Sequence, residues 1–447
     1  MTDADTPLQI NTLLTLLLIA SATAICTKWI KIPYAVALVT AGLCIGLFKV
    51  LPPVQMTPDL VLVIFLPALL FECAWSLDLD ILRKNWRAIC ALATVGVVVC
   101  MFGVAVILHC LGSMNYTTAM LFGAMIAATD PVSVIALCRR LGVDHRLTMI
   151  LEGESLFNDG TAVVLFKIVL AVVLAGTAFS PVKCAFDFVF TVLGGAVFGA
   201  GVGFATSKIT SAFDDHLLET MITAVVAYGT YLAADQLHLS TVIAVVAAGI
   251  VVGNYGAKQG MSATTRFAVD SFWEFAAFLC NSLLFLLIGL QVQIPLLMKH
   301  KSQIGLGILA VVIARIIVVY GICPCVSTRT LPIPIKWQHF LFWGGLRGAL
   351  VMALALSLPL SFPDREGIIN MTFGVVLFTL LIPGLTIEPL ARVLGIRAEG
   401  TSNSAERPLR AHLEPHDVES EKLTLDRLRE EGKISDDDYD SFRKASS

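Results

Sequence analysis

Charged residues are scarce in this sequence. Aspartate, glutamate, lysine and arginine make up 15% of its 447 residues, whereas a soluble globular domain has about 25%. Apolar residues make up 57%. They fall in runs of roughly 17–25 residues, the length of a helix that crosses about 30 Å of hydrocarbon. Most runs lack the polar stripe of a helix in a soluble protein, so the sequence predicts a helical membrane protein.

Motifs of several other protein classes are absent. The eleven cysteines include no C-x-x-C pair, so no zinc site is indicated. The motifs H-E-x-x-H, G-x-S-x-G and G-x-x-x-x-G-K-[ST] do not occur, which leaves a metalloprotease, a serine hydrolase and an ATP-driven pump without support. The N-terminus carries Asp3 and Asp5 and no basic residue, unlike a secretory signal. We expect no enzyme activity, no cofactor and no nucleic-acid partner.

Hydropathy predicts an all-α polytopic membrane protein with about thirteen transmembrane helices. The composition becomes polar after Arg397, so we expect a transmembrane domain at 1–397 and a short cytoplasmic tail at 398–447. The predicted spans are 8–27, 33–51, 59–76, 88–111, 117–138, 147–176, 185–209, 217–236, 240–254, 267–294, 303–327, 338–360 and 367–391.

Basic residues favour every second predicted loop. With the N-terminus outside, fifteen fall in cytoplasmic loops and five in outer loops, as the positive-inside rule expects. This bias predicts an odd number of crossings in a cell membrane, with the C-terminus in the cytoplasm. The cytoplasmic set is Lys28, Lys31, Arg83, Lys84, Arg87, Arg139, Arg140, Arg146, Lys208, Lys258, Arg266, Arg329, Lys336, Arg392 and Arg397. The outer set is Lys49, Lys183, Lys299, Lys301 and Arg365.

Two predicted spans are interrupted near their middle. The segment T-D-P at 129–131 contains a proline, which removes a backbone hydrogen bond and biases Asp130 away from the helix. The segment G-G-L-R-G at 344–348 places three glycines and a charge in a later span. Broken helices at corresponding positions of two halves indicate a transporter site near the membrane midplane. The two halves would extend over about 59–176 and 267–391.

Ionisable residues inside the predicted spans are few, and such residues normally mark function because they are costly at bilayer depth. On the span at 147–176, Ser155 and Asp159 share one stripe of the helix, and Glu154 and Asn158 share the next. Oxygen ligands of this kind suit a hard monovalent cation. The ionisable set is Glu72, Asp130, Glu152, Glu154, Asp159, Lys167, Arg315 and Arg347.

An exchanger of cations for protons needs a carboxyl group that binds either ion. Burial favours the protonated form of a carboxyl group and a bound cation favours the ionised form, so the two ions compete. We assign this role to Asp159. Asp130 and Thr129 on the broken helix complete the site, where freed backbone carbonyls can coordinate the ion.

The other deep charges have different interpretations. Glu154 and Arg315 are predicted to form a structural ion pair. Arg347 is predicted to compensate the dipole at a helix C-terminus. For Glu72 two alternatives stay open: it supports the ion-binding residues, or it is a buried acid bound to backbone.

Charges nearer the ends of the spans are expected at the membrane interface. This group comprises Glu152, Lys167, Asp235, Asp270 and Glu274.

Three motifs in this order resemble the cation/proton antiporters of the NhaP and NHE type: T-D-P at 129–131, E-G-E-S-L-F-N-D-G at 152–160 and G-G-L-R-G-A at 344–349. The resemblance covers about residues 8–397. It implies two inverted repeats whose broken helices cross near the midplane. It also implies a moving core domain, a dimerisation domain and a homodimer in the lipid membrane that works by an elevator-like movement.

The resemblance also implies roles for individual residues. The ion-binding carboxylate of the family matches Asp159, and its other ligands match Ser155, Asp130 and the backbone around Thr129. The Glu–Arg pair of the family matches the ion pair already predicted. Asn158 beside Asp159 is similar to the branch that exchanges one sodium ion for one proton, so electroneutral exchange is expected.

The sequence therefore predicts a secondary transporter that exchanges Na⁺ or Li⁺ for H⁺ and serves pH homeostasis. Potassium/proton exchange by the same fold stays open, because the coordinating residues do not exclude a larger ion. A channel is disfavoured, because a deep acidic cluster beside an arginine suits a closed, alternating site. The short tail is more like that of a prokaryotic exchanger than that of an animal exchanger.

Overall fold

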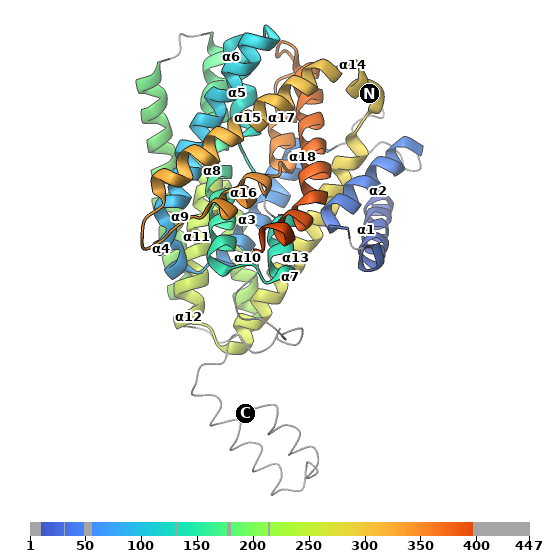
Figure 1. Cartoon of the computed structure of the whole chain (residues 1–447). Coiled ribbons are helices and arrows are strands. Elements are labelled where there is room, and N and C mark those ends of the chain that lie inside the picture. The colour runs from blue at the N-terminus through green and yellow to red at the C-terminus, as the bar shows by residue number, and fades with distance from the viewer. Residues whose placement is uncertain are drawn as a thin grey trace, which may run out of the picture. The chain divides into compact units, whose positions relative to one another are not determined.

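The computed structural model describes residues 10–30, 32–48, 56–130, 132–176, 180–212 and 215–396. Throughout these ranges the regular elements are helices (Figure 1). Pro131 and the predicted tail at 398–447 lie outside the described residues.

The helices follow one another along the chain with short connections, and each predicted span overlaps at least one of them. In the first half they are α1 (Ile10–Ile30), α2 (Tyr34–Phe48), the π-helical η2 (Leu60–Phe65) with α3 (Leu66–Ser76), α4 (Leu79–Cys90), η3 (Ala91–Val95), α5 (Gly96–Gly112), α6 (Tyr116–Ile126), α7 (Val132–Leu141) and α8 (His145–Ala175). In the second half they are α9 (Pro181–Thr210), α10 (His216–Gln236), α11 (Thr241–Val251), η4 (Val252–Gly256), α12 (Ala257–Gln259), α13 (Ala263–Gln291), α14 (Ile294–Lys299), α15 (Lys301–Val326), α16 (Ile335–Trp343), α17 (Ala349–Leu356) and α18 (Arg365–Leu394).

Local sequence sets where many of these helices begin. Polar side chains accept hydrogen bonds from the first free backbone N–H groups, which is the usual role of an N-cap residue. These N-caps are Asp78, Asn115, Asp144, Asp215 and Ser240. Gly176 and Gly395 end α8 and α18 in the left-handed conformation that glycine adopts readily.

Seven helices of the described chain are long and apolar enough to cross a membrane. The remaining apolar helices are shorter, in part because two of the predicted spans are broken. The number of crossings stays a prediction. The seven are the continuous helix Leu79–Gly112 together with α8, α9, α10, α13, α15 and α18.

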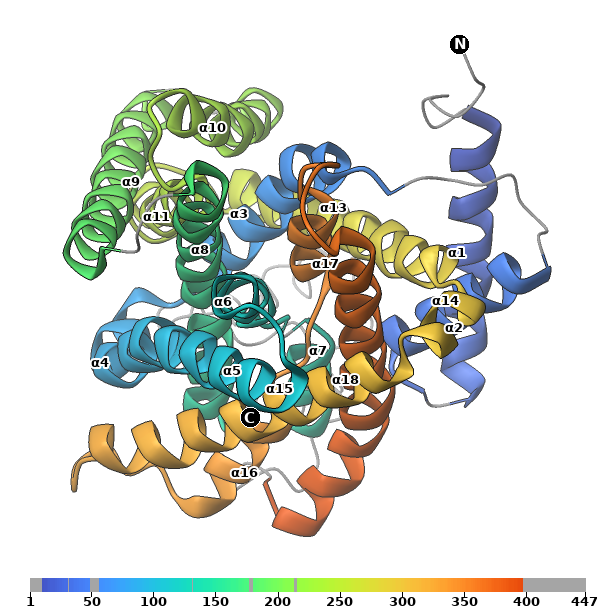
Figure 2. The same cartoon turned by 90° about the horizontal axis from the view of Figure 1, so that it is seen from above.

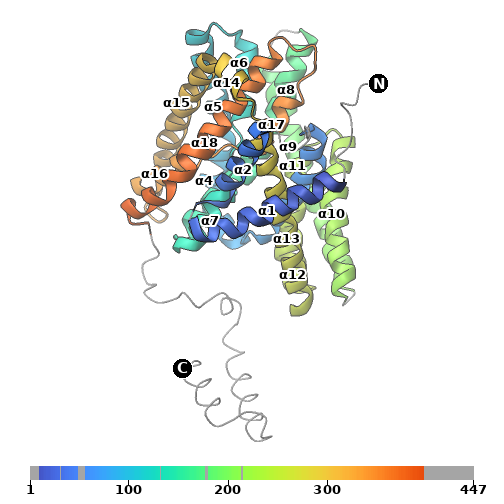
Figure 3. The same cartoon turned by 90° about the vertical axis from the view of Figure 1, so that its right-hand side faces the viewer.

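The helices form two bundles. In the first, α2 packs on α13, and α11 packs on α3, α9 and α10. In the second, α5 packs on α6 and α15, α8 on α4 and α6, and α18 on α15 and α17. Seen from above, the first bundle extends as an arc from α9 and α10 past α13 to α1 and α2 (Figure 2). The side view places α15, α16 and α18 on one side and α9, α10 and α11 on the other (Figure 3).

The two interrupted spans meet inside the second bundle. Residues 127–130 separate α6 from α7, and residues 344–348 separate α16 from α17. The N–H of Asp130 donates to the carbonyl of Leu346 at 2.8 Å, so the two unwound segments pair through their backbones. Gly348 permits this approach, because a Cβ atom there would lie 2.5 Å from the Cβ of Asp130.

Candidate functional site

The unwound residue Thr129 is held by α8. Asn158 Oδ1 accepts from the N–H of Thr129 at 3.2 Å, and its Nδ2 donates to the hydroxyl of Thr129 at 2.8 Å. The hydroxyl of Ser155 donates to the carbonyl of Thr129. All three residues are buried, and these bonds replace the helical hydrogen bonds that the break removes.

Asp159 lies one turn beyond Ser155 on the same helix. Its Oδ1 is shielded from solvent and has no hydrogen-bond partner among the described residues. Asp159, Asp130, Thr129 and Ser155 all line one cavity of about 500 Å³. The structure therefore brings together the four residues that the sequence predicts as ion ligands, and their oxygen atoms suit a hard cation.

Glu154 points to the other side of α8 and pairs with Arg315 on α15. Arg315 Nη1 and Nη2 donate to Glu154 Oε1 and Oε2 at 2.6 and 3.1 Å. Nη2 also donates to the carbonyl of Leu341 at 2.9 Å. The side chain of Glu154 is 2% exposed and that of Arg315 is 8% exposed. The two hydrogen bonds let the opposite charges neutralise each other where water does not reach them.

Arg347 belongs to the unwound segment between α16 and α17, and its side chain reaches the C-terminal end of α6. Its Nη1 donates to the carbonyls of Ala127 and Ala128 at 2.6 and 2.8 Å, and its backbone N–H donates to the hydroxyl of Thr379 at 3.1 Å. The side chain is 1% exposed. The guanidinium group thus lies against the negative end of α6. The partner Thr379 has no signal in the sequence.

The cavity lies between the two bundles. Tyr34 on α2 and Cys73 on α3 line it from the first bundle, with Phe278 on α13. The unwound residues, α8 and α17 line it from the second bundle. Glu72 also lines the cavity.

One expectation about the span ends is wrong. Lys167, Asp235, Asp270 and Glu274 are exposed, whereas Glu152 is only 7% exposed and lines the cavity. It lies three residues before Ser155, so it faces the same way along α8. The spacing of Glu152 from Ser155 in the sequence indicates that the two side chains share a face of α8. The contact of Cys73 on α3 with Glu152 depends on tertiary packing and has no signal in the sequence.

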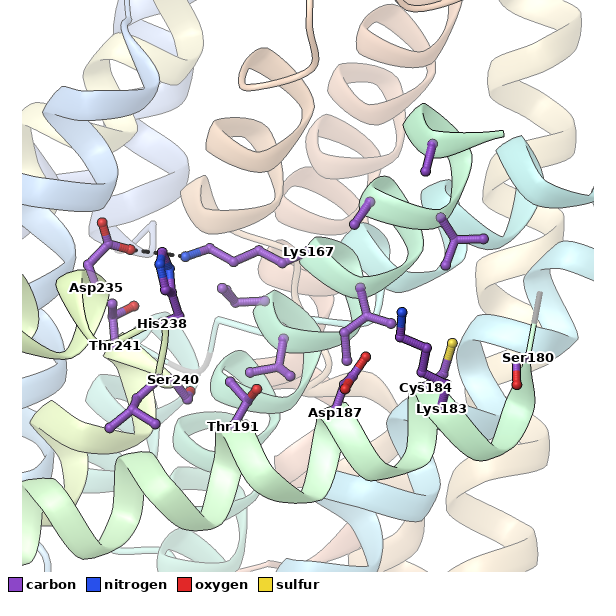
Figure 4. Close-up of a pocket in the computed structure, with 17 residues that line it drawn as sticks. Lys167, Ser180, Lys183, Cys184, Asp187, Thr191, Asp235, His238, Ser240 and Thr241 are labelled. Carbon is purple, nitrogen blue, oxygen red and sulfur yellow. Dashed lines mark hydrogen bonds and ion pairs between the residues drawn. The ribbon is translucent and has the colours of Figure 1, made fainter. Parts of the chain in front are cut away.

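A second cavity, of about 440 Å³, lies further along α8 (Figure 4). Lys167 crosses it and pairs with Asp235 at 3.2 Å, next to the connection between α10 and α11. Between the residues of α8 that line the two cavities, Gly160 packs against Ile243 of α11. A Cβ atom at Gly160 would lie 2.6 Å from Ile243 Cγ1, so the contact there is tight.

Broken helices that meet at acidic residues, which line a cavity between two bundles of apolar helices, define a membrane transporter of ions. Residues 14–393 match the family model described as "Sodium/hydrogen exchanger, transmembrane". The chain belongs to this family and is a multi-pass membrane protein.

Two relatives have names that agree with this family. The chain is 44% identical over 382 residues to a protein named Na⁺/H⁺ antiporter ApNhaP from Aphanothece halophytica, covering 85% of this chain and 73% of that one. It is 44% identical over 365 residues to a protein named low-affinity Na⁺/H⁺ antiporter NhaS1 from Synechocystis, covering 80% and 69%.

A solved structure supports the fold. The sodium proton antiporter MjNhaP1 from Methanocaldococcus jannaschii superposes with a TM-score of 0.71 at 21% identity, covering 86% of this chain and 98% of that one. The predicted antiporter fold is confirmed.

Proposed function

We propose that this chain exchanges sodium ions for protons across a membrane, and that both ions compete for Asp159. The observation that carries the proposal is the buried Asp159 Oδ1, which lacks a hydrogen-bond partner in the described chain and lies among Asp130, Thr129 and Ser155. Such an oxygen is stabilised by a proton or a cation. The family and the names of its relatives support this reaction, and they do not favour potassium/proton exchange.

Competition for one carboxyl group is sufficient for exchange. A proton and a sodium ion each neutralise Asp159, whereas the empty carboxylate carries a charge that is costly to move through the membrane. The loaded site therefore changes its accessibility and the empty site does not. Sodium released on one side is replaced by a proton from that side.

We also propose that one sodium ion exchanges for one proton. Asn158, beside Asp159, is uncharged and uses its amide group to hold Thr129. Glu154 is balanced by Arg315. Because the charges of Asn158, Glu154 and Arg315 do not change during the cycle, one sodium ion at Asp159 is exchanged for one proton at Asp159. The cycle then moves no net charge.

The two cavities support alternating access along α8. Arg139 lines the cavity at Asp159, and the positive-inside rule places that arginine in the cytoplasm. We assign this cavity to the cytoplasmic side and the cavity at Lys167 to the outer side, with the N-terminus outside and the C-terminus inside. The bundle that contains α8 would be the moving core, and the other bundle would form a homodimer in the lipid.

Everted membrane vesicles that contain a pH-sensitive dye test the proposal. Sodium and lithium are expected to release protons from wild-type vesicles, and Asp159→Asn is expected to abolish the response while the protein still inserts. Asp80→Asn, which removes an exposed acid outside the cavity, is the control and should remain active. A response to potassium alone, or ordinary exchange by Asp159→Asn, would contradict the proposal.

A further inference from the structure

Glu152 faces the ion cavity from the same side of α8 as the candidate ligands. Glu152, Ser155 and Asp159 are spaced by three and four residues, so they form one stripe of the helix. All three line the same cavity, and Glu152 is 7% exposed. An ion that moves along this stripe towards Asp159 passes Glu152.

The two acids of this helix segment are neutralised in different ways. Glu154 has a two-pronged partner in Arg315. None of the ion pairs in the described ranges involves Glu152, and its carboxylate accepts a hydrogen bond from the thiol of Cys73 at 3.7 Å. A thiol is a weak donor. A buried carboxyl group with so weak a hydrogen-bond partner is stabilised by a proton or by a cation that enters the cavity.

The walls around Glu152 favour a cation over an anion. Glu72 on α3 and Glu274 on α13 line the same cavity. The one basic residue among its described lining residues is Arg139, which forms no ion pair with these acids within the described chain. A cavity with an excess of carboxylates concentrates cations from the adjoining solution.

We propose that Glu152 holds a monovalent cation in the cavity before the ion reaches Asp159. This inference rests on the proposed exchange function and adds a residue to it. Glu152 recruits the ion, and Asp159 then exchanges it for a proton. Removal of the Glu152 charge therefore weakens the capture of sodium without removing the group at which the two ions compete.

The expected effect follows from the distance along the helix. Seven residues separate Glu152 from Asp159 by about 10 Å. One charge at that distance changes the affinity for a cation roughly 4-fold to 16-fold, at effective dielectric constants of about 40 and 20. Glu152→Gln is therefore expected to raise the KM for sodium by that factor in everted vesicles, with the maximal rate retained.

Matched variants separate charge from structure. Glu152→Asp keeps the charge and is expected to keep a KM near that of the wild type, and Asp80→Asn removes a charge elsewhere and should leave KM unchanged. Glu152→Ser provides the same neutral comparison if the glutamine variant does not reach the membrane. An unchanged KM in a neutral Glu152 variant that folds, or a fall in maximal rate alone, would overturn the inference.

A binding measurement makes the test independent of transport. In purified Asp159→Asn protein, sodium should raise the melting temperature relative to choline, because a bound ligand stabilises the folded state. The shift should disappear in Asp159→Asn with Glu152→Gln. An equal shift in both proteins overturns the inference alone, whereas wild-type vesicles that do not exchange sodium would instead overturn the proposed function.

Discussion

Ser155 and Asn158 satisfy three polar groups of one unwound residue, Thr129. These hydrogen bonds fix where the carbonyl of Thr129 lies relative to Asp159. At this scale the geometry of the cavity depends on single oxygen and nitrogen atoms. Loss of one hydroxyl is therefore expected to affect ion binding more than folding.

The first prediction concerns Ser155. Ser155→Ala is expected to raise the KM for sodium about tenfold, because one hydrogen-bonding oxygen contributes about 1.4 kcal/mol. Ser155→Thr keeps a hydroxyl group and should stay closer to the wild type. Sodium titrations of dye-loaded vesicles measure both, and equal KM values for the alanine variant and the wild type would refute the assignment.

The second prediction concerns the ion pair. Arg315→Ala leaves Glu154 buried without its partner and is expected to lower the free energy of unfolding by about 3–5 kcal/mol. Lys167→Ala removes a partner from an ion pair whose side chains are 58% and 59% exposed, where the loss is about 0–1 kcal/mol. Melting temperatures in detergent compare them. Similar decreases in melting temperature for the two variants would show that the buried ion pair stabilises the protein no more than the exposed one.

The sequence is sufficient to predict Asp159, Asp130, Ser155 and Thr129 as neighbours, because the helical period and the two breaks constrain them. It is not sufficient for Glu152. A hydropathy pattern locates that residue near a span end, but its burial depends on α3 packing across α8. Contacts of this kind join residues far apart in the chain.

At the scale of elements, the breaks and the helix ends behave differently. Both breaks are predictable, because proline and clustered glycine disfavour a continuous helix. The ends of helices are harder to predict from the sequence. The span predicted at 88–111 belongs to a helix that begins at Leu79, because Asp78 caps it and a polar amphipathic turn precedes the apolar run. Hydropathy marks the apolar part of a helix and not its whole length.

The third prediction concerns the crossing of the breaks. Gly348→Ala places a Cβ atom against the carboxylate of Asp130, so it is expected to cost about 1–3 kcal/mol and to impair exchange. Gly321→Ala is the control, because nothing lies within 4 Å of the added atom on α15. Melting temperature and vesicle exchange measure the two variants. Wild-type behaviour of Gly348→Ala would mean that the breaks tolerate separation.

At the scale of the whole molecule, the fourth prediction concerns pH. Protons and sodium compete for Asp159, so a lower pH is expected to raise the KM for sodium, by about tenfold per unit once the proton predominates. The rate at saturating sodium should not fall as the pH is lowered, because the return step uses a proton. Exchange measured at a series of equal inside and outside pH values tests this. A maximal rate that falls while KM stays constant would contradict direct competition.

The backbone bond between Asp130 and Leu346 has a consequence for biosynthesis. A nascent chain inserted only as far as α13 already contains Glu154 and the amide of Asp130, but Arg315 and the carbonyl of Leu346 have not yet entered the membrane. At that stage the N-terminal half lacks the partners that Glu154 and the Asp130 amide have in the complete protein. A chain truncated at this stage is therefore expected to be less stable in the membrane than the complete chain.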